Sequence, residues 1–149
     1  MNKKGFTLVE LLAVIVLLAI LTGIAVPNVI STINNNKRQT FLTDAKRMVS
    51  KAEYLLVKRK DDRDKLLNNE VTFIKYYLNS SQLNSEDEFL NDPDSGSYDL
   101  NSYVKITYNQ TSKKYEYCIY LKGSRRKIGD SFTCLSSSEL TGIDVVLDN

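Results

Sequence analysis

A single carboxylate stands at the head of a long apolar stretch near the start of the chain. The stretch reads KKGFTLVELLAVIVLLAILTGIAVPN, and Glu10 lies four residues after Phe6, with no charged residue from position 11 to position 36. A charge within a membrane helix costs roughly 2.5–3.5 kcal/mol on insertion scales, less near an end. Glu10 is therefore expected to have a function and a specific partner.

Other chemistry is poorly represented. The 149-residue chain has no histidine, which removes the commonest general base and a common zinc ligand. It contains no glycine-rich phosphate loop and no combination of residues for a Ser-His-Asp or Cys-His site. The net charge of +2 gives no strong general attraction to nucleic acid. The sequence predicts a protein that is not an enzyme, has no catalytic residue and needs no cofactor.

A cut between Gly5 and Phe6 would supply the missing partner. The new α-amine on Phe6 would be a cation one helical turn from Glu10, which also suits the positive end of a helix dipole. In a packed array of such helices, the amine of one chain could pair with the glutamate of its neighbour. Such pairing relieves the desolvation of a buried charge and fixes the register of the array.

The apolar stretch is long enough to cross a membrane. Residues 6–26 provide the roughly 20 mainly apolar positions that a spanning helix needs. Lys3 and Lys4 precede it, so the positive-inside rule predicts a cytoplasmic N-terminus, with lipid around the helix and everything after Pro27 outside. Two plainer alternatives are a secretory signal peptide cut near the Gly-Ile-Ala at 23–25, and a simple signal anchor, which would have no use for Glu10.

The string Lys-Gly-Phe-Thr-Leu-Val-Glu-Leu-Leu, followed by an apolar run, resembles the N-termini of type IV pilins and the related pseudopilins. The resemblance covers residues 3–30. It implies that a prepilin peptidase cuts after Gly5 and methylates the amine of Phe6, and that Phe6 and Glu10 act in filament assembly. Pro27 stands where members of the family commonly carry a proline.

The resemblance also implies a fold and a set of partners. The expected fold is α+β, with a long N-terminal helix packed on a small antiparallel sheet. The expected divisions are a leader at 1–5, a transmembrane and filament-core segment at 6–27, and a globular head at 28–149. Expected partners are copies of itself and related pilins, the peptidase, a membrane platform protein and an assembly ATPase.

Several functions stay open within this resemblance: a surface pilus, a DNA-uptake pilus or a secretion pseudopilus. Nucleic-acid binding is undecided, since Arg125, Arg126 and Lys127 form the only run of three basic residues in the sheet half of the head. Outside the family, the alternative is a signal-anchored surface binding domain that never polymerises.

The chain departs from the family at one point. Many bacterial pilins have a glycine in the middle of the segment, where the helix unwinds, but Ala19 stands there and the nearest glycine is Gly23. Pro27 removes the amide that would bond the carbonyl of Gly23. Residues 22–27 are therefore the expected site of a kink or of local melting.

After Pro27 the pattern predicts that the same helix continues to about Lys60 with one apolar face. The polar run at 58–65 is expected to end it as a loop, and residues 68–83 are expected to form a second helix. The predicted core face of the long helix comprises Ile30, Ile33, Phe41, Ala45, Met48, Ala52 and Leu55.

A loop is expected at 85–102, where an Asn-Asp-Pro sequence favours a turn. Asp92, Asp94 and Asp99 form a weak calcium candidate, because their spacing does not match an EF-hand loop.

Alternating residues then predict a hairpin over 103–123, and the segments 132–135 and 142–147 are candidates for further strands. Cys118 and Cys134 form a disulfide candidate if this region is exported, the alternative being two ordinary thiols.

Overall fold

The computed structural model describes residues 7–79, 83–84, 89 and 91–148. The chain divides into two compact units, Met1–Asn36 and Lys37–Asn149, and each is treated separately below. The elements are, in order, α1 (Leu8–Lys58), α2 (Lys60–Leu67), β1 (Ile74–Tyr77), β2 (Tyr103–Asn109), β3 (Lys114–Lys122), β4 (Arg126–Ile128), β5 (Leu135–Ser136), the short 3-10 helix η1 (Gly142–Asp144) and β6 (Val146–Leu147).

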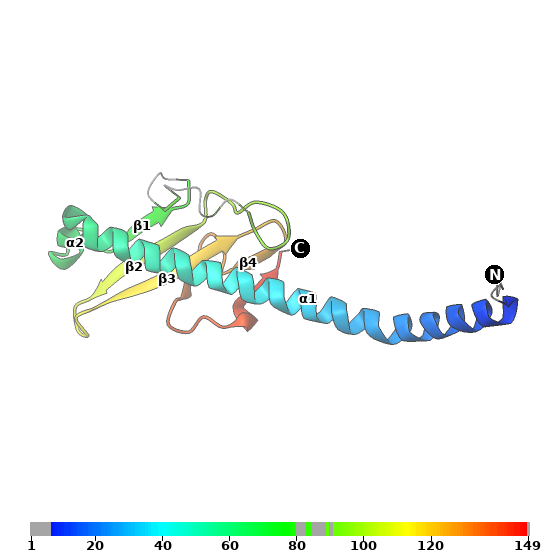
Figure 1. The fold of residues 1–149 in the computed structure, drawn as a ribbon. Coiled ribbons are helices and arrows are strands. Elements are labelled where there is room, and N and C mark those ends of the chain that lie inside the picture. The colour runs from blue at the N-terminus through cyan, green and yellow to red at the C-terminus, as the bar shows by residue number, and fades with distance from the viewer. Residues whose placement is uncertain (1–6, 80–82, 85–88, 90, 149) are drawn as a thin grey trace. The chain divides into compact units, whose positions relative to one another are not determined.

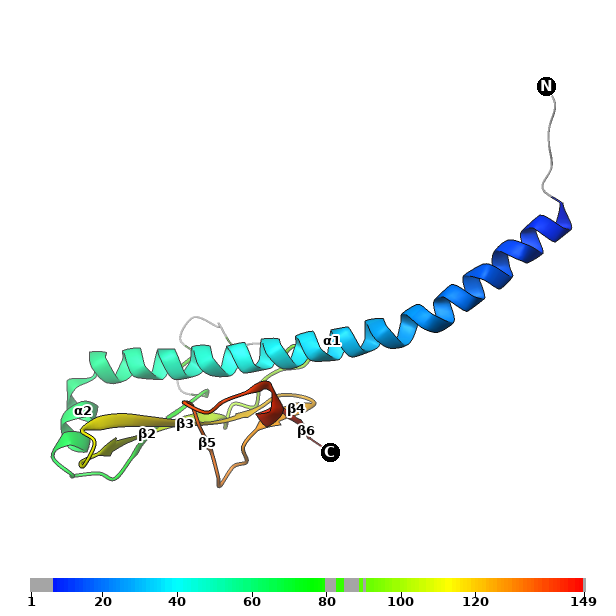
Figure 2. The same cartoon turned by 90° about the horizontal axis from the view of Figure 1, so that it is seen from below.

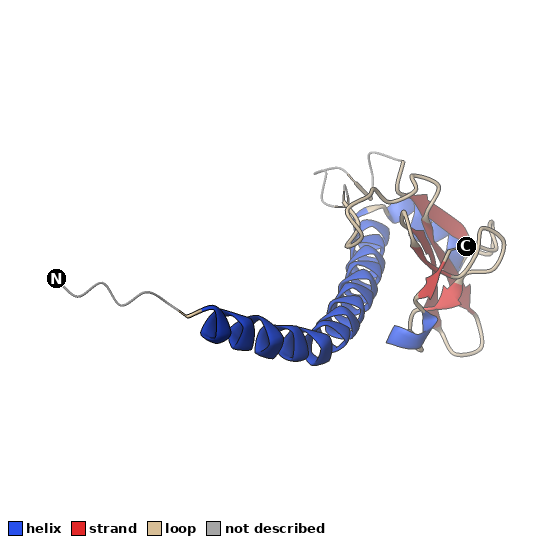
Figure 3. Ribbon diagram, turned by 90° about the vertical axis from the view of Figure 1, so that its right-hand side faces the viewer, coloured by secondary structure: helices blue, strands red, loops and turns tan. Residues whose placement is uncertain are grey.

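The head, Lys37–Asn149, is built on the second part of α1. This part of the helix runs along one face of the sheet, as Figure 2 shows, and Figure 3 shows the strands in red as one layer beside it. Its apolar residues recur every three or four positions, so they line one side of the helix and pack on the sheet. The buried residues of α1 are Phe41, Leu42, Ala45, Met48, Ala52, Leu55 and Leu56. Five of these were predicted, whereas Ile30 and Ile33 are exposed.

The described strands form one antiparallel sheet in the order β1-β2-β3-β4-β6, with β5 also paired to β3 (Figure 1). The predicted hairpin is confirmed, since Val104 pairs with Ile119 and Tyr108 with Tyr115. Alternation places one residue in two on the helix side of each strand. Val104, Ile106, Ile119 and Leu121 are fully buried there. The α+β prediction is therefore confirmed, and β1 and β4 are strands that the sequence did not predict.

Two local predictions were wrong. Residues 68–83 were expected to form a helix, but Ile74–Tyr77 is strand β1, which pairs with β2 from Ile74↔Ile106 to Tyr77↔Tyr103. The segment 58–65 was expected to be a loop, but α1 ends at Lys58 and a new helix begins at Lys60. This helix buries Leu66 and has acidic residues in its first turn and Lys65 in its last, as the helix dipole favours.

Only part of each of the two candidate strand segments near the C-terminus lies in a strand. Leu135 is the one residue of 132–135 that lies in a strand, and 142–147 divides into η1 and β6. Asp148 then fixes the end of the chain, with Lys122 and Lys127 each 2.6 Å from its carboxylate. These hydrogen bonds lower the pKa of Asp148 to about 2.

Two tyrosines, Tyr98 in the loop before β2 and Tyr76 on β1, tie other parts of the head to the helices. The hydroxyl of Tyr98 donates to Asp44 on α1 at 2.7 Å, and the hydroxyl of Tyr76 donates to Asp62 on α2 at 2.9 Å. Burial, followed by the neighbouring carboxylate, raises the pKa of Tyr98 and of Tyr76 well above the ordinary value of about 10. Both side chains therefore stabilise the head as protonated phenols.

This arrangement predicts alkaline instability. A phenol whose pKa is raised in the folded state contributes stability that is complete below pH ~10 and lost as the pH rises through the folded pKa. Tyr98→Phe should lower the free energy of unfolding at pH 7 by about 1–3 kcal/mol, because Asp44 loses its donor. It should also reduce the further loss of stability as the pH rises above about 10.

The measurement is urea unfolding of the full-length protein in detergent, followed by near-ultraviolet circular dichroism. Tyr54→Phe is the matched control, since Tyr54 lies exposed on α1. A Tyr98→Phe variant with the wild-type pH profile would contradict the role assigned to this hydroxyl.

Candidate functional site

The start of α1 carries the glutamate singled out above. The backbone amide of Thr7 donates to Oε2 of Glu10 at 2.9 Å, and the Thr7 hydroxyl donates to the same oxygen at 2.8 Å. In return, the amide of Glu10 donates to the Thr7 hydroxyl oxygen at 3.3 Å. This is a capping box, in which the residue before a helix and the third residue within it satisfy each other.

The capping box stabilises the Glu10 carboxylate within this chain. One carboxylate oxygen receives two hydrogen bonds at the helix end where the dipole favours negative charge. The described residues offer Glu10 no cation, and Gly5 and Phe6 lie outside them. The Thr-x-x-Glu spacing at residues 7–10 is the sequence signature of this capping box, and it is absent from the predictions made above.

The segment behind Glu10 has the properties of a membrane span. α1 contains a stretch long and apolar enough to cross a membrane by length and composition. Every residue from 7 to 36 is exposed, so nothing else in the described chain covers this apolar surface. A helix that is apolar on all sides requires lipid or other protein around it.

The helix is continuous through its expected weak point. α1 runs from Leu8 to Lys58 with Pro27 inside it. Next to the proline, the Asn28 side-chain amide donates to the carbonyl of Ile24 at 3.3 Å. A Cβ built on Gly23 would meet nothing within 4 Å, so packing within this chain does not require a glycine there.

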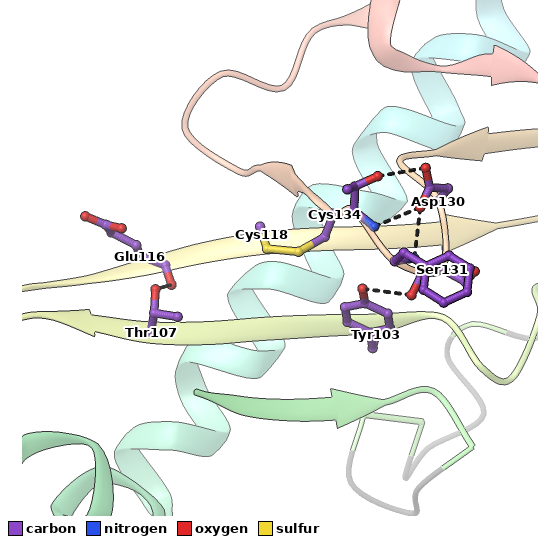
Figure 4. Close-up of a disulfide and its surroundings, with 9 residues drawn as sticks. Tyr103, Thr107, Glu116, Cys118, Asp130, Ser131 and Cys134 are labelled. Atoms are coloured by element: carbon purple, nitrogen blue, oxygen red, sulfur yellow. Dashed lines mark hydrogen bonds between the residues drawn. A yellow bond between two sulfur atoms is a disulfide. The ribbon is translucent and has the colours of Figure 1, made fainter. Parts of the chain in front are cut away.

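The cysteines are joined by a disulfide bond, which Figure 4 shows. Cys118 lies on β3 and Cys134 lies 16 residues later, with 5.4 Å between the two Cα atoms. Before Cys134, the Asp130 carboxylate accepts hydrogen bonds from the amides of Phe132 and Thr133, both at 2.8 Å. The Thr133 hydroxyl and amide hold the pKa of Asp130 below its usual value. The turn before Cys134 is thus fixed both by the disulfide bond and by the hydrogen bonds that the Asp130 carboxylate accepts.

The three aspartates named as a calcium candidate have separate structural partners. Asp92 accepts hydrogen bonds from the amides of Asp94 and Gly96, each at 2.9 Å, and from the amide of Ser124. Although burial acts to raise it, these bonds hold the pKa of Asp92 below its usual value.

Asp94, almost fully buried, lies 2.6 Å from Nε of Arg126 and 3.3 Å from Nζ of Lys37. Asp99 accepts the amide of Asn101. No three metal-binding side chains gather in the part of the chain that the structure describes. Asp92 fixes the loop to the β3–β4 turn, and Asp94 fixes it to β4 and α1.

Comparison with known proteins bears on the N-terminal segment. Residues 1–26 match the family model described as the prokaryotic N-terminal methylation motif. This motif is the signature of type IV pilins and pseudopilins, so the predicted resemblance is confirmed over this segment. Comparisons with curated proteins and with solved structures return no match.

The disulfide predicts a stability difference that mass and unfolding can measure. Exported protein should contain one intramolecular Cys118–Cys134 bond, and a double Cys→Ser variant should lose about 3 kcal/mol of unfolding free energy, as expected for a loop of roughly 15 residues. Alkylation before and after reduction, followed by mass spectrometry, counts the thiols. Two alkylated cysteines without reduction would refute the prediction.

Proposed function

We propose that this chain is a structural subunit of a type IV pilus or a related pilus-like filament. One observation carries the proposal. The Glu10 carboxylate, held in a capping box, stands at the start of an otherwise uncharged apolar helix, four residues after the Gly5-Phe6 junction and within the motif matched at residues 1–26. A plain membrane anchor has no need of a costly charge at that place. A filament subunit needs it to recognise the next subunit.

Processing is the first step of the proposed mechanism. Lys3 and Lys4 keep the leader, residues 1–5, in the cytoplasm while the helix spans the membrane. A prepilin peptidase then cuts between Gly5 and Phe6 and methylates the new amine of Phe6. The peptidase supplies this chemistry, and the present chain supplies the substrate.

Assembly follows from the exposed apolar helix. Residues 6–27 leave the lipid by packing against the same segment of other copies or of related pilins, driven by a platform protein and a cytoplasmic ATPase. The Phe6 amine of one subunit pairs with Glu10 of its neighbour. In this dry core the ion pair sets the stagger between helices, because an unpaired buried charge is strongly unfavourable.

The head, Lys37–Asn149, forms the filament surface outside the cell. Its anchored loops and its disulfide suit a surface exposed to an oxidising environment. Filament growth on the bacterial surface follows insertion as a single-pass membrane protein with a cytoplasmic N-terminus.

Processing can be read from the mass of the mature chain. We expect the loss of residues 1–5 and the gain of one methyl group on Phe6. Gly5→Val should block the cut, because a β-branched side chain crowds the backbone that a peptidase must approach. An intact N-terminus on the wild-type protein would favour a signal-anchored binding domain, and normal cutting of the valine variant would refute the role of Gly5.

Substitution of Glu10 separates assembly from insertion. Glu10→Ala makes the segment more apolar, so expression, insertion and leader removal should persist while filaments disappear, because the neighbouring amine is left unpaired at a cost of roughly 3–5 kcal/mol. Glu10→Gln should be nearly as defective, since an amide cannot neutralise an amine. The readout compares sheared surface filaments with the membrane fraction, in cells without a wild-type copy. Wild-type filament yield from the alanine variant would refute the proposed pairing.

A further inference from the structure

A polar groove crosses the head beside the disulfide, at some distance along the chain from the N-terminal motif. It consists of two adjoining cavities of about 240 and 180 Å³, which share Glu116, Tyr117 and Ser136 in their linings. Figure 4 shows Glu116 of β3 and Thr107 of β2 close together beside the Cys118–Cys134 bond. The groove therefore lies over the β2–β3 hairpin rather than in the core.

The groove exists because β3 is only partly paired along one edge. β5 covers Cys118 and Ile119, and the Ser137 amide donates to the carbonyl of Tyr117 at 2.9 Å. No described strand continues this pairing toward Lys114. The last residue of β5 and the two that follow it are three consecutive serines, 136–138, which line the larger cavity.

The lining combines hydroxyls with two lysines. Lys105 and Thr107 line the smaller cavity, whereas Lys114 and the serines line the larger one. Since Lys105 pairs with Cys118 and Lys114 precedes Cys118 by four residues, the two lysines are about 14 Å apart along the strands. Neither lysine forms an ion pair with a carboxylate among the described residues, and both are therefore available to an anionic ligand.

Glu116 lies between these lysines and is held in place. Its Oε1 accepts the side-chain amide of Asn109 at 2.7 Å. A carboxylate in the middle of the groove repels a ligand with a charge on every unit, but it accepts a hydrogen bond from a hydroxyl. Along the groove, a lysine ammonium thus lies toward each end, and the Glu116 carboxylate, a hydrogen-bond acceptor, lies between them.

An exposed aromatic ring lies beyond the Lys105 end. Phe73 is 48% exposed, and the Lys105 ammonium lies 5.9 Å from its ring centroid. Tyr103 is only 3% exposed, with Lys75 at 4.0 Å from its ring centroid. The Phe73 ring is therefore open to a ligand, whereas the Tyr103 ring is covered.

We propose that this groove binds a carboxylated polysaccharide. The two lysines pair with carboxylates on non-adjacent sugars, while Glu116 and the serines bond to hydroxyls between them. Phe73 offers a flat apolar surface to a sugar ring at one end. The inference is separate from the proposed assembly, since the groove belongs to the head of a single chain and requires no filament.

The test measures binding to the full-length protein in nonionic detergent by fluorescence anisotropy. The probe is an end-labelled oligogalacturonate with a free carboxylate on every second sugar and a methyl ester on the sugars between (the acid), compared with its fully esterified, neutral form (the ester) and with an oligo-dT of equal charge. We expect the acid to bind at least tenfold more tightly than the ester. The double variant Lys105→Gln/Lys114→Gln should bind the acid about tenfold less tightly, a change of about 1.4 kcal/mol.

The matched control removes the same charge elsewhere. Lys46→Gln/Lys58→Gln, at two exposed positions on α1, should leave binding within about twofold of wild type. Glu116→Gln should reduce the ratio of the affinity for oligogalacturonate to the affinity for oligo-dT. Equal losses in the two double variants, unchanged binding in the groove variant, or oligo-dT binding as tight as oligogalacturonate would each overturn the proposal.

Discussion

The helix α1 lies under one physical constraint, namely that its two parts require different surroundings. Up to Asn36 every described residue of it is exposed and most are apolar, whereas after Lys37 one face is buried against the sheet. The second part is stable in water because its apolar face is buried, whereas exposure of the apolar first part to water is unfavourable. Lipid or other protein around the first part would meet this constraint, and the capping box satisfies one oxygen of its single carboxylate, Glu10.

The head is under a different constraint, because it must fix irregular segments in one conformation with few strands. Its loops are fixed by carboxylates that accept backbone amides, as Asp92 and Asp130 do, and by the nearly buried pair of Asp94 and Arg126. Removing one partner of such a pair leaves a buried charge unpaired, which destabilises more than the pair itself stabilises. The head can therefore present a defined surface although much of its chain lies outside helices and strands.

The two wrong predictions at 58–83 have the same cause, namely that contacts with distant segments decided the local structure. Val71, Ile74 and Leu78 are spaced as on a helix, but Ile74, Tyr76 and Leu78 also alternate as on a strand. Pairing with β2 selects the strand and buries Tyr76 and Leu78. The helix α2 forms in a polar run because Leu66 gains a place in the core, a benefit that no local pattern displays.

The sequence by itself determined the N-terminal motif, the apolar segment, the helical face from Phe41 onward and the β2–β3 hairpin, because each depends on residues close together in the chain. The cysteine pairing needed only two cysteines and an assumption of export. The tertiary structure alone decided the strand order, the partners of Asp92 and Asp94, and the groove beside Glu116. Many of their contacts join distant residues, such as Asp92 with Ser124 at 32 positions and Asp94 with Lys37 at 57, and such contacts form only when burial and strand pairing bring distant segments together.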